Sequence, residues 1–222
     1  MLAPDTMYRT LPPLEYFRLL VADPASTPLL EAAASIAHDA YPSFDLQGFL
    51  GEFDLLARRM SDACRGAGSG HARLTRSLRC FHHTLGFAGN VDAYYDPDNS
   101  YLHRVIETRR GIPISLAVLF VELARGVGLD ARGVGFPGHF LVRVDLEDEV
   151  AIIDPFTGSV LDHDLLAHLA DAHGQSAERL LAPATASQIL ARMLHNLRQI
   201  HEQRGNADLL GKVEARLRLL GG

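Results

Sequence analysis

The 222-residue sequence contains very little cysteine and almost no lysine. Cys64 and Cys80 are the two cysteines, they form no C-x-x-C pair, and Lys212 is the single lysine among 21 basic residues. Two isolated cysteines support neither a disulfide framework nor a zinc knuckle. We therefore expect two free thiols, buried as this small apolar side chain usually is.

Long hydrophobic runs and excess positive charge are also lacking. No stretch reaches the ~18 to 20 uninterrupted apolar residues of a membrane-spanning helix. The first ten residues, M-L-A-P-D-T-M-Y-R-T, contain no apolar core that could serve as a secretory signal. Twenty-one basic against 27 acidic residues give a net charge of −6. We expect a cytoplasmic protein whose charge gives no support for binding nucleic acid or a membrane.

The composition that remains is typical of a globular chain. Hydrophobic residues make up 47% of the sequence, charged residues 22%, and the mean hydropathy is +0.04. At ~150 residues per domain, this length fits one domain with an appendage better than two domains. We predict an α+β fold with a helical N-terminal lobe over residues 1–110, a core over 111–160 and C-terminal helices over 161–222.

Apolar residues at helical spacing predict several helices in the first part of the chain. The expected helices cover residues 29–38, 46–64, 74–85, 101–107 and 114–127. Asp, Asn and Ser residues in the loop at 94–100 are suited to cap the helix after that loop. The helix at 114–127 follows Gly111-Ile112-Pro113 and is strongly apolar, so we expect it to be buried.

The second part of the chain predicts strands and then helices again. Short apolar or alternating runs at 131–136, 140–144 and 150–153 are typical of antiparallel strands, and an acidic turn joins the last two in a hairpin. Helices are expected at about 163–172, 187–204 and 207–220. The last two, over 187–220, have the helix–turn–helix shape of one tetratricopeptide-like unit.

Three residues of the predicted core form a candidate catalytic set. Ser115 lies in the first turn of the buried helix, where the helix dipole and free amides stabilise developing negative charge. His139 opens one strand and Asp154 ends the next, so the carboxylate can orient the imidazole. Ser115 would be the nucleophile and His139 the general base. The same side chains could instead form a satisfied buried polar cluster.

Several segments resemble the transglutaminase-like superfamily. L-A-V-L-F-V-E-L-A-R-G-V-G-L-D-A-R resembles its nucleophile helix, G-H-F-L-V-R-V its histidine strand and I-I-D-P its aspartate strand. More closely, Y-Y-D-P-D-N-S-Y-L, R-R-G-I-P-I-S-L and G-V-G-F-P-G-H-F resemble the bacterial SirB-type branch. The resemblance covers nearly the whole chain and implies a core of the papain-like cysteine-protease type with a tetratricopeptide-like tail.

The sequence departs from the superfamily at the nucleophile. Ser115 stands where transglutaminases and related peptidases place cysteine, and neither Cys64 nor Cys80 lies in a motif that could replace it. A helix N-terminus can stabilise a thiolate, but serine does not ionise in this way. The resemblance implies that serine is usual in the SirB-type branch, so cross-linking of glutamine to lysine is not expected.

Two functions from different classes remain. The first is a pseudoenzyme that acts as a peptide-binding, protein-binding or regulatory module, with a protein or peptide as partner. The second is a serine-dependent hydrolase or acyltransferase on amide or ester bonds, in which Asn99 or Tyr101 helps form the oxyanion hole. It requires Ser115 Oγ within about 2.6–3.2 Å of a His139 ring nitrogen. The candidate partner-binding residues are Asn99, Tyr101, Arg110, Phe136 and Gly138.

The other polar motifs predict neither a metal nor a cofactor. The loop Asp96–Ser100 imitates the start of a calcium loop, but Tyr101 stands where that loop needs glycine, so a capped turn is favoured. Arg109 and Arg110 are expected to pair with this acidic loop. Several histidines show no spacing typical of zinc ligands, namely His82, His83, His103, His163 and His168.

Overall fold

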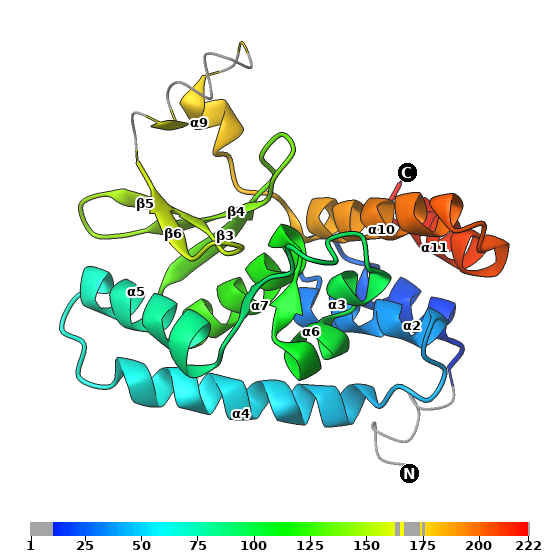
Figure 1. The fold of residues 1–222 in the computed structure, drawn as a ribbon, viewed down its shortest axis with the longest axis horizontal. Helices are drawn as coiled ribbons and strands as arrows, with labels where there is room; N and C mark the ends of the chain where they lie inside the picture. Colours follow the sequence, from blue (N-terminus) through cyan, green and yellow to red (C-terminus); the bar gives the residue numbers. More distant parts are fainter. Residues whose placement is uncertain (1–10, 163–164, 167–173, 175, 222) are drawn as a thin grey trace.

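The computed structural model describes residues 11–162, 165–166, 174 and 176–221. Helix α7 (Pro113–Gly126) runs through the middle of the molecule, with a sheet at one end and the helix pair α10 (Ala186–Gln203) and α11 (Ala207–Leu219) at the other (Figure 1). Helix α4 (Leu46–Cys64) lies along one side. The chain therefore contains both helices and a sheet, as predicted.

The N-terminal part is helical. Its elements are α2 (Pro13–Leu20), α3 (Leu29–Ser35), the 3-10 turn η1 (Ile36–Asp39), α4, α5 (Gly70–Arg79) and the π turn η2 (Cys80–Thr84). Helix α4 has the predicted bounds, because Asp45 caps its first turn by accepting a hydrogen bond from the amide of Gln47. Helix α5 begins four residues before the predicted start, since Ser69 caps it in the same way.

The connection to α7 corrects two expectations about charged residues. It contains β1 (Ala88–Gly89), η3 (Pro97–Ser100), α6 (Leu102–Thr108) and β2 (Arg110–Gly111), and β1 pairs with β2 in parallel. Asp96 caps η3 rather than α6, whose first turn has no side-chain cap. Asp98 pairs with Arg104 at 2.9 Å, whereas Arg109 lies over the Phe87 ring, so the predicted pairing with Arg109 and Arg110 is wrong.

The sheet has four antiparallel strands in sequence order. They are β3 (Asp130–Val134), β4 (Leu141–Asp145), β5 (Val150–Asp154) and β6 (Ser159–Leu161). Three of the strands match the predicted runs within about two residues, while β6 was not predicted. Helix α7, buried on nearly every side, packs against β3 and β4. This packing brings one end of α7 close to the sheet and its connecting loops (Figure 1).

One large hydrophobic core connects the N-terminal helices, α7, the sheet and the C-terminal helices. A smaller cluster lies apart from it and includes Val134, Phe136 and Ile152. Cys64 and Cys80 are buried free thiols, as predicted. Of the helix predicted at 163–172, only residues 165 and 166 are described, so that prediction falls outside the described part. A short helix, α9 (Ala177–Leu180), precedes α10.

A buried ion pair joins the end of the described chain to its beginning. The Arg216 side chain on α11 is 0% exposed and donates hydrogen bonds to both Asp39 carboxylate oxygens, at 2.6 and 2.9 Å. Its guanidinium also lies 4.9 Å from the centre of the Phe17 ring on α2. Helix α11 is therefore fixed against η1 and α2. Within the described residues, every helix is too short or too polar to cross a membrane.

Candidate functional site

Ser115 is completely buried at the start of α7. Its hydroxyl lies 2.6 Å from the Asn99 carbonyl oxygen and 3.0 Å from the Ile112 carbonyl oxygen, and it accepts a hydrogen bond from the Ile112 amide at 3.1 Å. The hydroxyl thus ties the first turn of α7 to the end of η3. Among the described residues, its hydrogen-bond partners are all backbone groups and do not include His139.

His139 and Asp154 are brought together, although His139 lies in the bend before β4 and does not open a strand as predicted. His139 Nε2 lies 2.9 Å from Asp154 Oδ1. The ring nitrogen is not aligned as a hydrogen-bond donor, so the contact is a close electrostatic one. The pair lies near the surface, since the His139 side chain remains 31% exposed.

Asp154 is held in its charged form by three neighbours. Its Oδ1 accepts the Phe156 amide at 2.8 Å, and its Oδ2 accepts the Thr157 hydroxyl at 3.0 Å. Burial opposes ionisation, but these bonds and the His139 imidazole outweigh it and hold the pKa of Asp154 below its ordinary value. The carboxylate is therefore a fixed negative charge beside His139.

Arg192 on α10 positions the backbone around His139. Its guanidinium donates to the Phe136 carbonyl at 3.1 Å and to the His139 carbonyl at 2.6 Å, and it lies 5.5 Å from the centre of the Phe140 ring. Burial lowers the pKa of Arg192. No sequence pattern points to Arg192, because it is one of several polar positions on an amphipathic helix more than fifty residues from His139.

Two other predicted site residues, Asn99 and Tyr101, are buried inside the fold. The buried Asn99 amide donates to the carbonyls of Ala93 and Tyr94 at 2.7 and 3.1 Å. The buried Tyr101 hydroxyl lies 3.2 Å from His201 Nε2, and burial raises its pKa. Their polar groups are therefore occupied inside the fold.

Arg110, Phe136 and Gly138 lie in different surroundings. Arg110 is exposed and donates to the Gly86 carbonyl at 3.1 Å. Phe136 is buried in the smaller hydrophobic cluster. Gly138 is exposed in the turn before His139 and has a φ of 70°, a conformation that favours glycine. Of these three residues, only Gly138 lies directly next to the His139–Asp154 pair in the chain.

Comparisons with known proteins identify the family. Residues 47–195, which include Ser115, His139 and Asp154, match the sequence profile described as transglutaminase-like superfamily. The chain belongs to the transglutaminase-like superfamily. A UPF0162 protein of Xylella fastidiosa strain Temecula1 is 35% identical over 211 residues, which cover 90% of this chain and 74% of that protein.

Further relatives of this transglutaminase-like protein are bacterial and animal. A UPF0162 protein of Pseudomonas aeruginosa is 34% identical over 181 residues, which cover 80% of this chain and 66% of that protein. Mouse F-box only protein 21 is 33% identical over 130 residues, covering 54% of this chain and 20% of its own length. No solved structure matches the chain.

A half-buried phenylalanine and two exposed tyrosines extend outward from the His139–Asp154 pair of the transglutaminase-like protein. The Phe156 ring is 6.5 Å from the His139 ring and 6.0 Å from the Tyr94 ring, measured between centres. Tyr94 in turn packs edge-on against Tyr95, which is 65% exposed. We call Tyr94, Tyr95 and Phe156 the aromatic face.

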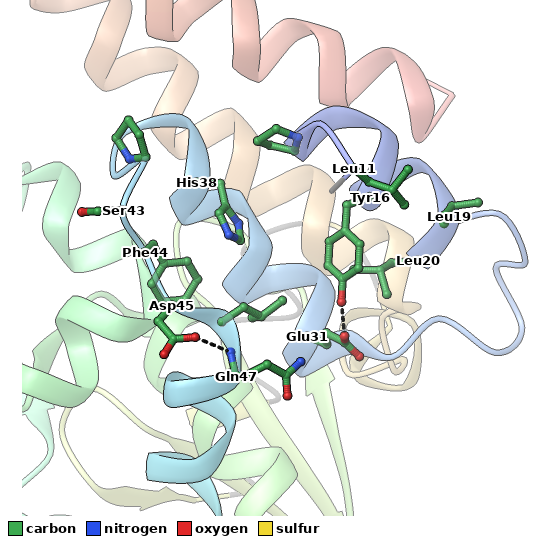
Figure 2. Close-up of a pocket in the computed structure, with 13 residues that line it drawn as sticks. Leu11, Tyr16, Leu19, Leu20, Glu31, His38, Ser43, Phe44, Asp45 and Gln47 are labelled. Atoms are coloured by element: carbon green, nitrogen blue, oxygen red, sulfur yellow. Dashed lines mark hydrogen bonds between the residues drawn. The ribbon is translucent and has the colours of Figure 1, made fainter. Parts of the chain in front are cut away.

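A groove of about 1020 Å³ lies elsewhere, between α2, α3 and the start of α4 (Figure 2). Its lining mixes apolar and polar side chains and includes none of the predicted site residues. The Glu31 carboxylate accepts a hydrogen bond from the Tyr16 hydroxyl, and Asp45 accepts one from the Gln47 amide (Figure 2). Both acids in the groove thus already have partners.

Replacing Ser115 with alanine should destabilise the protein by about 1–3 kcal/mol, because the buried Ile112 amide loses its hydrogen-bond partner. Urea denaturation followed by circular dichroism would measure the change. Ser100→Ala is a matched control, since the Ser100 hydroxyl is similarly buried but has no hydrogen-bond partner among the described residues. Equal stability losses in the two variants would contradict a structural role for Ser115.

Proposed function

We propose that this protein is a SirB-type member of the superfamily that does not catalyse acyl transfer and instead binds a peptide or protein segment. The observation that carries the proposal is the burial of Ser115 and the use of its hydroxyl by backbone groups. A serine nucleophile needs a base within hydrogen-bond reach and contact with the substrate carbonyl. The surroundings of Ser115 favour a structural role.

The aromatic face supports the binding part of the proposal. Rigid aromatic side chains are common anchors in protein interfaces because they bury large areas at little entropic cost. Tyr94 and Tyr95 are exposed to solvent, and the charge of Asp154 and the imidazole of His139 lie beside Phe156. An extended peptide could therefore meet apolar and polar groups along one surface.

The C-terminal helices fit this proposal as a support for the same surface. Arg192 binds the backbone carbonyl of His139, and Arg204 donates to the carbonyl of Tyr95 at 3.5 Å. Both arginines come from α10 or the residue after it. We interpret the pair α10–α11 as a single tetratricopeptide-like unit that stabilises the peptide-binding surface of a papain-like core.

Selection from a displayed library of random 12-residue peptides tests the proposal. We expect selected peptides to bind the wild type saturably and to lose about tenfold or more in affinity in Tyr95→Ala, because a central aromatic anchor typically contributes about 2 kcal/mol. Leu55→Ala is the control, since Leu55 is an exposed apolar residue on α4. Failure to enrich peptides, or equal loss in both variants, would argue against a peptide-binding surface.

A covalent probe tests the non-catalytic part separately. We expect a fluorophosphonate to leave Ser115 unmodified in folded protein, as read by mass spectrometry. A Ser115 adduct that disappears in His139→Ala would overturn the proposal and establish the serine hydrolase alternative.

A further inference from the structure

The segment over residues 63–91 is basic in an acidic protein. It contains four arginines, three histidines and neither aspartate nor glutamate, while the chain as a whole carries a net charge of −6. This segment forms the end of α4, α5, η2 and β1. The question is which of these basic side chains are neutralised within the fold.

The first half of the basic segment has acidic or carbonyl partners. His71 Nε2 lies 2.9 Å from Glu149 and Arg73 lies 3.9 Å from Glu147, both in the turn between β4 and β5. Arg65 pairs with Asp62, and Arg76 donates to the Arg65 carbonyl at 2.7 Å. These contacts account for the charges at the start of α5.

The second half is not neutralised. Arg79 and His83 are exposed, and within the described residues neither makes a hydrogen bond or an ion pair. Both line a hollow of about 360 Å³ between η2 and the turn that joins β5 to β6. The hollow is lined by Leu78, Arg79, His82, His83, Thr157 and Gly158.

His82 presents an unused nitrogen at this hollow. Its Nδ1 lies 2.9 Å from the Phe87 carbonyl and is therefore the protonated nitrogen of the neutral ring, whereas Nε2 is buried and has no partner in the described part of the chain. A Cβ on Gly158 would lie 3.1 Å from Nε2, so glycine allows the turn to approach the ring. A buried unpaired ring nitrogen is costly unless something binds to it.

We propose that this hollow is a subsite for a single oxyanion, the carboxylate or phosphate group of a peptide held at the aromatic face. Arg79 and His83 supply donors that have no partner among the described residues, whereas the Thr157 hydroxyl is already donated to Asp154. The Asp154 carboxylate accepts from the Phe156 amide and Thr157 and lies against His139, and among the described residues it makes no ion pair with Arg79 or His83. The inference rests on the proposed function in taking the oxyanion from a peptide.

The subsite adjoins the His139–Asp154 pair through Thr157. The Thr157 hydroxyl donates to Asp154 Oδ2, and the same residue lines the hollow. Phe156 is followed directly by Thr157 and Gly158, which line the hollow. A peptide bound along Phe156 would therefore also reach the hollow. An acidic or phosphorylated side chain on such a peptide is the ligand that this arrangement fits.

Binding of an anion at this place should be linked to proton uptake. His82 can donate to an anion only if Nε2 gains a proton, and burial lowers the pKa of His82 in the free protein. His83 opposes that protonation and Asp154 favours it. Affinity for an anion should therefore rise as the pH falls toward the lowered pKa of His82, because protonated His82 can donate to the anion.

Histidine NMR of the full chain tests the subsite with inorganic phosphate and with N-acetyl-aspartate N-methylamide, at constant ionic strength set by chloride. We expect saturable shifts of the His82 and His83 ring signals, with a loss of about tenfold or more in affinity in Arg79→Gln. Arg76→Gln is the matched control, because Arg76 lies one turn earlier on α5 and does not line the hollow.

Saturable binding of either probe supports the subsite, and the tighter probe identifies its oxyanion. Shifts that do not saturate, or equal affinity in Arg79→Gln and the wild type, would overturn it. The small anions report on the hollow whether or not peptides bind the aromatic face. Anion binding without peptide binding would therefore count against the proposed function alone.

Discussion

Replacing Arg216 with methionine should lower the free energy of unfolding by about 3–5 kcal/mol. The substitution leaves the Asp39 carboxylate largely buried without its cation, since the Asp39 side chain is only 10% exposed. The contact of the guanidinium with the Phe17 ring is lost as well. Urea denaturation followed by circular dichroism measures the effect, which should be among the largest of any single substitution in the chain.

The control for this prediction removes both charges. In Arg216→Met combined with Asp39→Leu, no buried charge is left unpaired, so most of the lost stability should return. The difference between the single and double variants separates the cost of an unpaired carboxylate from the contribution of packing. A single variant that loses less than about 1 kcal/mol would show that water reaches Asp39 easily.

Phe81→Ala should cost a comparable 3–5 kcal/mol, about the usual loss for a buried phenylalanine. The ring is 0% exposed, is stacked on Phe87 at 4.6 Å and packs edge-on against Phe120 of α7 at 5.3 Å. Its removal opens a cavity where η2 meets α7. The same denaturation experiment measures the loss.

Phe81→Leu is the matched control, because leucine keeps most of the buried volume and should cost only about 1–1.5 kcal/mol. The Phe81 ring also lies 5.1 Å from the His82 ring. The alanine variant should therefore shift the His82 ring signals in NMR, while the leucine variant shifts them less. Similar losses in the two variants would mean that aromatic contacts rather than volume determine stability at this position.

Sequence patterns located elements best where periodicity and capping agreed. The helix at 46–64 has an apolar repeat and Asp45 before it, and its predicted bounds are the observed ones. Helix α2 was not predicted, although the proline at its start is well tolerated in the first turn of a helix. Strand β6 has only three residues and is largely exposed, so it offered no apolar pattern.

The candidate site shows where sequence reasoning reaches its limit. The predicted hairpin brought His139 close to Asp154, because His139 lies two residues before β4 and Asp154 ends the neighbouring strand β5. The same reasoning placed Ser115 in the first turn of α7 but could not give the direction of its hydroxyl, which depends on the backbone of η3. Arg192 could not be predicted as part of the site for a similar reason, since its partners lie more than fifty residues away in the chain.

The ion pair between Asp39 and Arg216 also has a consequence for the order of folding during synthesis. The two residues are 177 positions apart, so η1 leaves the ribosome long before α11 is made. Until then the Asp39 carboxylate must stay hydrated, and α2 lacks the guanidinium that lies over Phe17. The first helices of the chain therefore complete their packing late, after nearly all of the described residues have been synthesised.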